Sequence, residues 1–154
     1  MIRSRGFTLT ELIIVIVLIG VISAAASSFF SRTGAFNAVA ARDQLIAMAM
    51  LAQKRALADA ASSRPVFLQI TQSSSAWTLS ITQNAQILMT ESLQRPAAAL
   101  QLNGSSLADG ESYTLRYAGD GSTGHNEQWT VVAENTYPLC ITSTGFSHHG
   151  SCQP

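Results

Sequence analysis

The distribution of apolar residues along the chain separates a short leader from a long apolar segment. Arg3 and Arg5 lie in the leader, and residues 12–30, which follow, contain no charged side chain. As a helix, a segment of this length would extend about 28 Å, which is sufficient to cross the hydrocarbon core of a bilayer. By the positive-inside rule, the two arginines predict a cytoplasmic N-terminus and an exported remainder. The pattern therefore predicts a transmembrane helix over residues 7–31.

The next stretch has helical periodicity. Apolar residues recur at steps of three or four, or at multiples of these steps, at Phe36, Val39, Ile46, Met50 and Leu57. Alanine, the strongest helix former, is frequent between them. Pro65 ends the helix, because the residue before a proline is pushed toward extended geometry. We therefore expect an amphipathic helix over residues 33–61 that continues the first helix, with Met48 and Met50 packed in the core.

Beyond Pro65 apolar residues alternate with polar ones, as they do in half-buried strands. The runs that show this pattern most clearly are 66–70, 77–81 and 113–117, and the further strand candidates are 87–93, 129–133 and 139–142. Residues 73–75 and 84–86 read as the first two turns, while the stretch between Pro96 and Asn103 is harder to assign. The sequence predicts an antiparallel β-meander over residues 66–149 packed on the long helix, and hence an α+β fold.

The charge balance excludes one class of partner. The 154 residues carry nine basic and nine acidic side chains, and only 12% of the chain is charged. Residues 32–154 hold seven basic and eight acidic residues, so the predicted exported part has no basic footprint for nucleic acid. Its other polar residues are uncharged, which suits a subunit that packs against copies or relatives of itself.

Catalytic motifs are not evident in the sequence. The loop at residues 119–124 contains three glycines, but it lacks the Gly-Lys-Ser/Thr ending of a phosphate-binding loop and precedes a strand. No nucleophile and base share a recognisable local signature. We therefore expect a protein that is not an enzyme and has no cofactor.

Two sets of side chains are potential metal ligands. The first set consists of the loop carboxylates Asp109, Glu111 and Asp120, which are suitable for calcium. The second set consists of the histidines His125, His148 and His149. Solvated loop carboxylates are the commoner case, and the histidines are scattered rather than spaced as zinc ligands. We therefore expect no metal.

The two cysteines, Cys140 and Cys152, enclose eleven residues near the end of the chain. In an exported domain a loop this short favours a disulfide, which would contribute about 2–4 kcal/mol. The alternatives are two free thiols in a cytosolic domain, or half of a metal site. Predicted export argues against the first, and no second cysteine pair or suitable histidine spacing supports the second. We therefore expect a disulfide.

One carboxylate, Glu11, lies at the start of the apolar segment. Burying an ionised carboxylate near a bilayer core costs about 2.5–3.5 kcal/mol, so this group is expected to have a partner. Gly6 and the aromatic Phe7 separate it from the basic leader. A secretory signal would instead place its apolar core before a small-residue cleavage site, such as one near Ala26. That interpretation leaves Glu11 and the Gly6–Phe7 pair unexplained.

This order of features closely resembles the class III signal of type IV pilins and type II secretion pseudopilins. The resemblance implies that residues 1–6 are a leader peptide, which a prepilin peptidase removes by cleaving between Gly6 and Phe7. It also implies N-methylation of Phe7 and a role for Glu11 in subunit registration. In a filament Glu11 can pair with the N-terminal amine of a neighbouring Phe7, and a low dielectric strengthens such a pair.

A looser resemblance covers residues 32–154, the expected periplasmic or extracellular pilin domain. Features similar to the pseudopilin H and FimT-type domain are Arg55, residues 64–68, Trp77, residues 115–117 and residues 144–146. The short cysteine loop and the polar composition resemble a minor pilin of a mannose-sensitive haemagglutinin (MSHA) type pilus. Ser28 stands where major pilins usually carry a proline, which favours a minor pilin over a major one.

These resemblances imply a minor pilin needed for pilus assembly, adhesion or function. It would be a single-pass inner-membrane protein with a periplasmic C-terminal domain, and would then enter a cell-surface pilus. The implied partners are prepilin peptidase, other pilin subunits and the membrane assembly platform. The contacts we expect with other subunits lie on the amphipathic helix and at residues 119–126.

The alternatives are a type II secretion pseudopilin and a membrane-anchored adhesin or binding module that does not polymerise. Glu11 argues against the second, because a simple anchor gains nothing from a carboxylate there. A competence pilin that captures DNA would fit the family, but the sequence has no basic patch.

Overall fold

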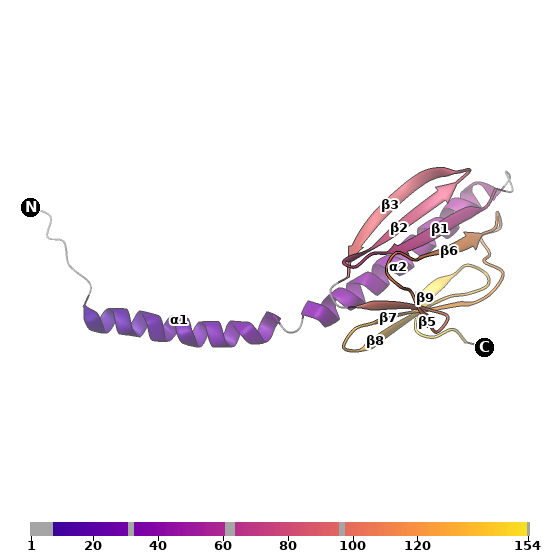
Figure 1. The fold of residues 1–154 in the computed structure, drawn as a ribbon. Coiled ribbons are helices and arrows are strands. Elements are labelled where there is room, and N and C mark those ends of the chain that lie inside the picture. The colour runs from indigo at the N-terminus through magenta and orange to yellow at the C-terminus, as the bar shows by residue number, and fades with distance from the viewer. Residues whose placement is uncertain (1–7, 31–32, 61–63, 96–97, 154) are drawn as a thin grey trace, which may run out of the picture. The chain divides into compact units, whose positions relative to one another are not determined.

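The computed structural model describes residues 8–30, 33–60, 64–95 and 98–153, with the side chains of 25–30 and 33–36 left aside. Helix α1 (Leu9–Phe30) belongs to a compact unit over Met1–Thr33. Helix α2 (Thr33–Ala58), apart from its first residue, and the strands belong to a second unit, Gly34–Pro154 (Figure 1). Both helices were predicted, and α2 ends three residues before the predicted end. Residues 31–32 lie outside the described residues, so one continuous helix stays a prediction.

Among the described residues the strands form two antiparallel sheets, and not the single meander that the alternation predicted. The first has the order β3-β2-β1-β6. Its strands are β1 (Val66–Gln72), β2 (Ala76–Gln83), β3 (Gln86–Gln94) and β6 (Ser112–Tyr117). The second has the order β5-β4-β7-β8-β9. Its strands are β4 (Ala99–Leu102), β5 (Ser105–Ser106), β7 (Glu127–Val132), β8 (Thr136–Ile141) and β9 (Ser147–His149).

Local turn chemistry sets the hairpins of the first sheet. Ser73 Oγ accepts a hydrogen bond from the Ala76 N–H at 3.0 Å and closes the β1–β2 turn. Asn84 and Ala85 both have positive φ, 54° and 60°, at the β2–β3 turn, as a two-residue type I′ turn requires. Both turns lie where the sequence predicted them. The predicted strands at 66–70, 77–81, 87–93 and 113–117 are confirmed as parts of β1, β2, β3 and β6.

The second sheet contains the elements that the alternation did not indicate. β4 lies in the stretch that the sequence left unassigned, and Asn103 (φ 51°) and Gly104 (φ 84°) turn it into β5. β9 has three residues, too few to show a period. The predicted strands at 129–133 and 139–142 correspond to β7 and β8, which begin and end slightly earlier.

Helix α2 buries a different face from the one predicted. The buried side chains are Ala38, Ala41, Leu45, Ile46, Met48, Ala49, Ala52 and Ala56. Of the predicted face, Ile46 is buried but Leu57 is 50% exposed, while Val39 and Met50 are half-buried. Met48 lies in the core as expected, and Met50 packs against it. The alanines are therefore contact residues as well as helix formers, since small side chains let the sheets approach the helix closely.

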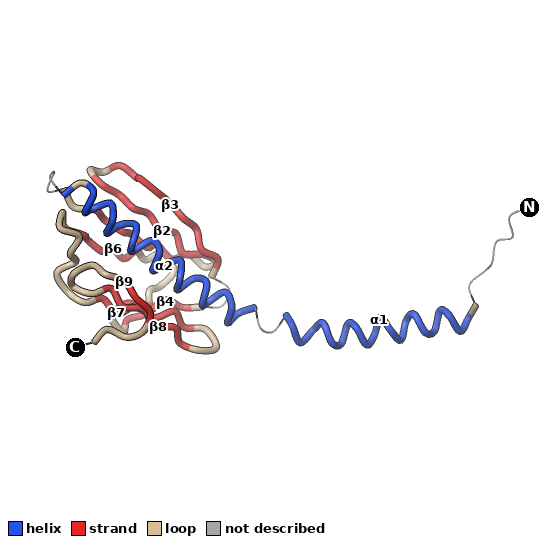
Figure 2. Tube along the Cα trace, turned by 180° about the vertical axis from the view of Figure 1, so that it is seen from behind, coloured by secondary structure: helices blue, strands red, loops and turns tan. Residues whose placement is uncertain are grey.

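One core joins α2 to both sheets. Its largest fully buried side chains are Trp77 from β2, Tyr117 from β6 and Trp129 from β7. Figure 2 shows α2 lying along the sheet made by β1, β2, β3 and β6. Because the inward-facing residues of both sheets belong to the same buried cluster, the second unit is held together as one α+β domain.

Candidate functional site

Glu11 lies in the first turn of α1. Its backbone N–H donates to Thr8 Oγ1 at 3.3 Å, and the Leu12 N–H donates to the Thr8 carbonyl oxygen at 3.2 Å. Thr8 therefore caps the helix, and Glu11 stands three residues later, the spacing of a capping box. A carboxylate in the first turn also interacts favourably with the positive end of the helix dipole. Initiation of α1 thus favours a carboxylate here, a reason that the interpretation of the sequence had missed.

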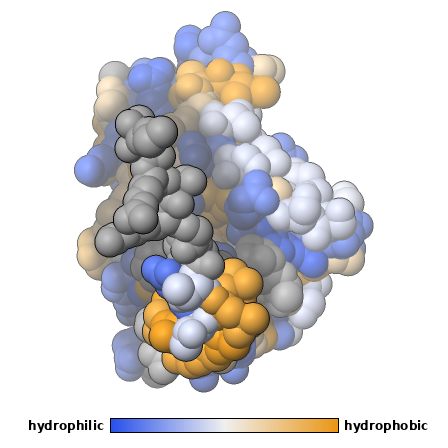
Figure 3. Space-filling model, turned by 90° about the vertical axis from the view of Figure 1, so that its left-hand side faces the viewer, coloured by the Kyte–Doolittle hydropathy of each residue, from blue (hydrophilic) through white to orange (hydrophobic). Residues whose placement is uncertain are grey.

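Most described side chains of α1 are apolar, and they are exposed on every side. The large ones from Leu9 to Ile22 are between 41% and 77% exposed, and Figure 3 shows hydrophobic residues around the helix. A helix that is hydrophobic all round is one that must be covered by other protein or by lipid. Across the described residues, no helix combines the length and hydropathy that a membrane crossing requires. Gly6 and Phe7, the predicted processing residues, lie outside the described residues.

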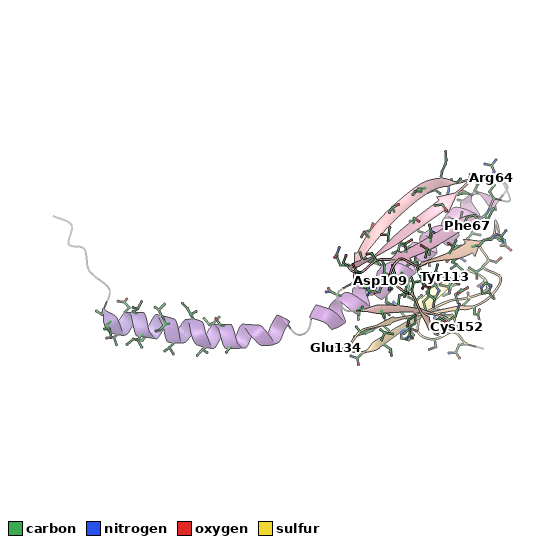
Figure 4. The ribbon with its side chains drawn as sticks, in the orientation of Figure 1. Arg64, Phe67, Asp109, Tyr113, Glu134 and Cys152 are labelled. Atoms are coloured by element: carbon green, nitrogen blue, oxygen red, sulfur yellow. A yellow bond between two sulfur atoms is a disulfide. The ribbon has the colours of Figure 1, made fainter. Side chains whose placement is uncertain are left out.

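The predicted disulfide is present. Cys140 lies in β8, between Gln128 on β7 and His148 on β9, and its sulfur is bonded to that of Cys152. Figure 4 shows this bond in yellow beside the label of Cys152. The Cys152 N–H donates to Gln128 Oε1 at 2.7 Å. The last residues of the described chain are therefore fastened to the second sheet by a covalent bond and a hydrogen bond.

The loop at 119–126, where we expected contacts with other subunits, is bonded to α2 by a side chain and packs closely against the turn at Gly145. Gln53 Nε2 on α2 donates to the Thr144 carbonyl oxygen at 2.9 Å and to the Gly121 carbonyl oxygen at 3.5 Å. A Cβ built at Gly145 would collide with the Gly121 carbonyl oxygen. Two segments that are distant in sequence therefore meet at a point where only a glycine fits.

A buried carboxylate, which the sequence analysis did not single out, lies at the start of β7. Glu127 is 1% exposed; its Oε1 lies 2.6 Å from His125 Nε2, and its Oε2 accepts a hydrogen bond from Asn103 Nδ2 at 2.5 Å. Burial, reinforced by a hydrogen bond to Glu127 and by its charge, raises the pKa of Tyr113 well above its ordinary value. Glu127, Trp129 and Val131 alternate in the sequence, so this carboxylate stood at a core-facing position.

The other carboxylates predicted as candidate metal ligands each contact a different partner. Asp109 Oδ1 lies 2.8 Å from Arg95 Nη1, Glu111 Oε2 accepts the Ala108 N–H, and Asp120 Oδ1 accepts from Ser122. The hydrogen bonds from the Ser122 side chain and backbone lower the pKa of Asp120. In the described ranges no three His, Cys, Asp or Glu side chains gather as a metal site would require.

His149 joins β9 to α2. Its Nε2 lies 3.0 Å from Asp43 Oδ1, which also accepts from Arg42 Nη2 at 2.8 Å. Partial burial raises the pKa of Asp43, but the hydrogen bonds and charges of Arg42 and His149 outweigh it and lower that pKa below its ordinary value. His148 has a different environment, with Nδ1 2.8 Å from the His149 carbonyl oxygen and its ring stacked on Phe146.

Comparison with known proteins identifies the N-terminal segment. Residues 1–27 match the family model of the prokaryotic N-terminal methylation motif. This match confirms the resemblance to the type IV pilin and pseudopilin family, and indicates a pilin-like or pseudopilin protein processed by prepilin peptidase. Neither a curated protein nor a solved structure matches the chain.

Proposed function

We propose that this chain is a minor pilin, a filament subunit needed for the assembly, adhesion or function of a type IV pilus. The observation that carries the proposal is the position of Glu11. This carboxylate lies within the residues that match the methylation motif, in the first turn of a helix whose other described side chains are uncharged. Helix initiation accounts for a capping side chain at this position, and a buried charge gains a further use where helices of several subunits are packed together.

In this proposal the prepilin peptidase cleaves between Gly6 and Phe7, and Phe7 is N-methylated. Residues 7–31 anchor the subunit in the inner membrane, with residues 32–154 in the periplasm, until the subunit enters a cell-surface pilus. The exposed apolar side chains of α1 support this, because lipid would cover them before assembly and neighbouring helices would cover them afterwards. Glu11 then pairs with the N-terminal amine of a neighbouring subunit.

In this proposal the second unit contributes an interaction surface. The carboxylates and histidines described above are each engaged in structural contacts. The polar, weakly charged surface of residues 32–154 suits close packing against other subunits. We place the contacts with other pilins on α2 and on residues 119–126.

The proposal is tested by shearing filaments from the cells and analysing their subunits by mass spectrometry. We expect this chain among the minor components, with an N-methylated Phe7 at its N-terminus. An N-terminus near Ala26 would refute the processing. Recovery of the processed chain only in membranes would refute the filament role and favour the adhesin. Recovery only in filaments that the type II secretion system builds would favour the pseudopilin.

A further inference from the structure

Strand β3 is an outer edge of the first sheet and is exposed over almost its whole length. It pairs with β2, and in the described sheet no strand lies beyond it (Figure 1). Of its nine residues only Leu93 is buried. Three consecutive apolar side chains are exposed: Ile87 by 69%, Leu88 by 42% and Met89 by 40%. The sheet therefore ends in a strand that is apolar and whose outward backbone groups face no other described strand.

The composition of β3 does not protect this edge. Natural edge strands usually carry lysine or proline, or are covered, because an open apolar edge associates with other strands. β3 contains neither lysine nor proline, and Glu91 is its single charged residue. A register shift between Ile81 and Thr82 of β2 makes Leu88 the extra residue of a β-bulge. After the bulge, residues 89–94 pair regularly with β2 and offer an uninterrupted edge.

Helix α2 leaves the core-facing side of β3 uncovered. Met89 pairs with Ile81, which is buried in the core. Glu91 pairs in the same way with the buried Leu79. Because paired residues point to the same face of a sheet, Met89 and Glu91 face the core side, and yet both are exposed. A groove therefore separates β3 from α2.

One end of this groove is an apolar pocket that contains a cation. The pocket has a volume of about 170 Å³, and its lining residues are Leu51, Arg55, Ile81, Leu88 and Met89. We call it the β3 pocket. Consecutive residues of a regular strand point to opposite faces, so the bulge explains why Leu88 and Met89 both line it. Arg55 Nε donates to Gln83 Oε1 at 3.1 Å, which holds the guanidinium at the pocket.

We propose that β3 and the β3 pocket form a docking site for an extended segment of another protein chain, which adds to the sheet as a further strand. The backbone of that segment bonds the outward N–H and C=O groups of residues 89–94, as in other complexes formed by strand addition. One of its apolar side chains enters the β3 pocket. The next side chain on the same face is a carboxylate, which pairs with Arg55.

The chemistry of the site selects this occupant. The walls of the β3 pocket are apolar, but Arg55 and its neighbour Lys54 are both exposed, so the site is complementary to a segment that carries an apolar and an acidic side chain. A small apolar ligand would leave both the cation and the open backbone edge without a partner. This inference goes beyond the proposed function, because strand addition at β3 requires no filament.

Short synthetic peptides test the proposal on the full-length protein in lipid nanodiscs. Two peptides alternate threonine with leucine and differ at one position on the leucine face, which is glutamate in the first and glutamine in the second. The glutamate peptide should slow amide hydrogen exchange at alternate residues of 89–94. It should also bind about tenfold more tightly than the glutamine peptide, as one charge-assisted hydrogen bond would give. A third peptide has the side chains of the first but an N-methylated backbone, and it should not bind.

Three variants show whether the peptides occupy the proposed site. Arg55→Gln should remove the preference for glutamate and leave the affinity for the glutamine peptide unchanged. Leu88→Ser should weaken both peptides about tenfold, because an apolar wall of the pocket is lost. Phe146→Ser is the matched control, since Phe146 is an exposed apolar residue, by 54%, before β9 in the second sheet.

Three results would overturn the proposal. Equal binding of the N-methylated peptide would exclude strand addition. A preference for glutamate that survives in Arg55→Gln would exclude the pairing with this cation. Unchanged amide exchange over residues 89–94 at about 1 mM glutamate peptide would exclude the site itself. None of these results bears on the composition of sheared filaments, so failure of this inference and failure of the proposed function are distinguishable.

Discussion

At the scale of single residues, Glu11 meets two requirements that are easily confused. As the third residue after Thr8 it stands at the position of the capping-box carboxylate, and as a carboxylate in an apolar helix it can pair with a cation on another subunit. A glutamine can serve the first purpose but not the second. The two roles can therefore be separated by one substitution.

We predict that Glu11→Gln leaves α1 helical and inserted but strongly reduces entry into filaments, because the capping partner is kept and the charge is lost. The measurement is the fraction of the subunit in sheared filaments relative to membranes. Thr8→Ala is the control, since it removes the cap at a cost of about 1 kcal/mol while keeping the carboxylate. Incorporation of Glu11→Gln at the normal level, with Thr8→Ala impaired, would show that capping is the role that matters.

Gly145 is the residue on which the contact between α2, the loop at 119–126 and the β8–β9 turn depends. It has φ +84°, and a side chain there would meet the Gly121 carbonyl oxygen and come within 2.9 Å of Gln53 Nε2. Gly110 has nearly the same backbone conformation, φ +86°, but a Cβ added there would have no other atom within 4 Å. Comparing alanine substitutions at Gly145 and Gly110 therefore separates the cost of backbone strain from the cost of a side-chain collision.

Gly110→Ala should lower the free energy of unfolding by about 1–2 kcal/mol, the cost of a left-handed conformation for a residue with a side chain. Gly145→Ala should lower it by that amount and by about 1–3 kcal/mol more, because backbone must move to make room. Denaturant unfolding of the full-length protein measures both. Equal destabilisation by the two substitutions would contradict the contact described at Gly145.

At the scale of elements, the buried face of α2 is built largely from alanine. Ala49, Ala52 and Ala56 are fully buried, while Ala47 on the same helix is exposed. We predict that Ala52→Leu destabilises the domain by about 1–3 kcal/mol through overpacking. Ala47→Leu should change stability by less than about 0.5 kcal/mol. Thermal unfolding of the two variants tests this prediction. If Ala52→Leu leaves the stability unchanged, the sheets do not approach α2 as closely as described.

The elements differ in how far the sequence could predict them. Strands β1 and β2 were predictable from their alternation, and β3 from the turn before it, because these are local signals. The pairing of β1 with β6 was not, since alternation states which side chains face inward but not which strands are neighbours. The buried alanines were read only as helix formers, because propensity and burial favour the same residue at those positions.

The candidate site was predictable where its chemistry is covalent or written in a short motif. The match over residues 1–27 confirms the motif that contains Gly6, Phe7 and Glu11, whose individual roles stay predictions, and the two cysteines of the chain form the expected disulfide. The Glu127 environment was not predicted, because Asn103 and His125 reach it only through the turns that bring their loops together. The signal that could have revealed this environment is the position of Glu127, which alternates with Trp129 and Val131 and so falls on the core-facing side of β7.

At the scale of the whole molecule, the N-terminal signal and the globular unit give different kinds of information. Residues 1–27 match a motif that specifies processing, whereas the second unit specifies a surface. The motif therefore indicates the class of protein, and under the filament proposal the surface determines which subunits it contacts. Measurements on the second unit and measurements on filaments consequently answer separate questions.

The pairing of β1 with β6 also bears on the order in which the domain is completed during synthesis. Val66 pairs with Tyr117, and Leu102 on β4 pairs with Trp129 on β7. The first sheet is therefore completed only after β4 and β5 of the second sheet have been synthesised, and the second sheet only after β6 of the first. Such non-local pairings form slowly. A chain interrupted before residue 112 would carry β1 with an open edge, which is a template for association with other chains. Quality control of nascent chains therefore matters more for this domain than its small size suggests.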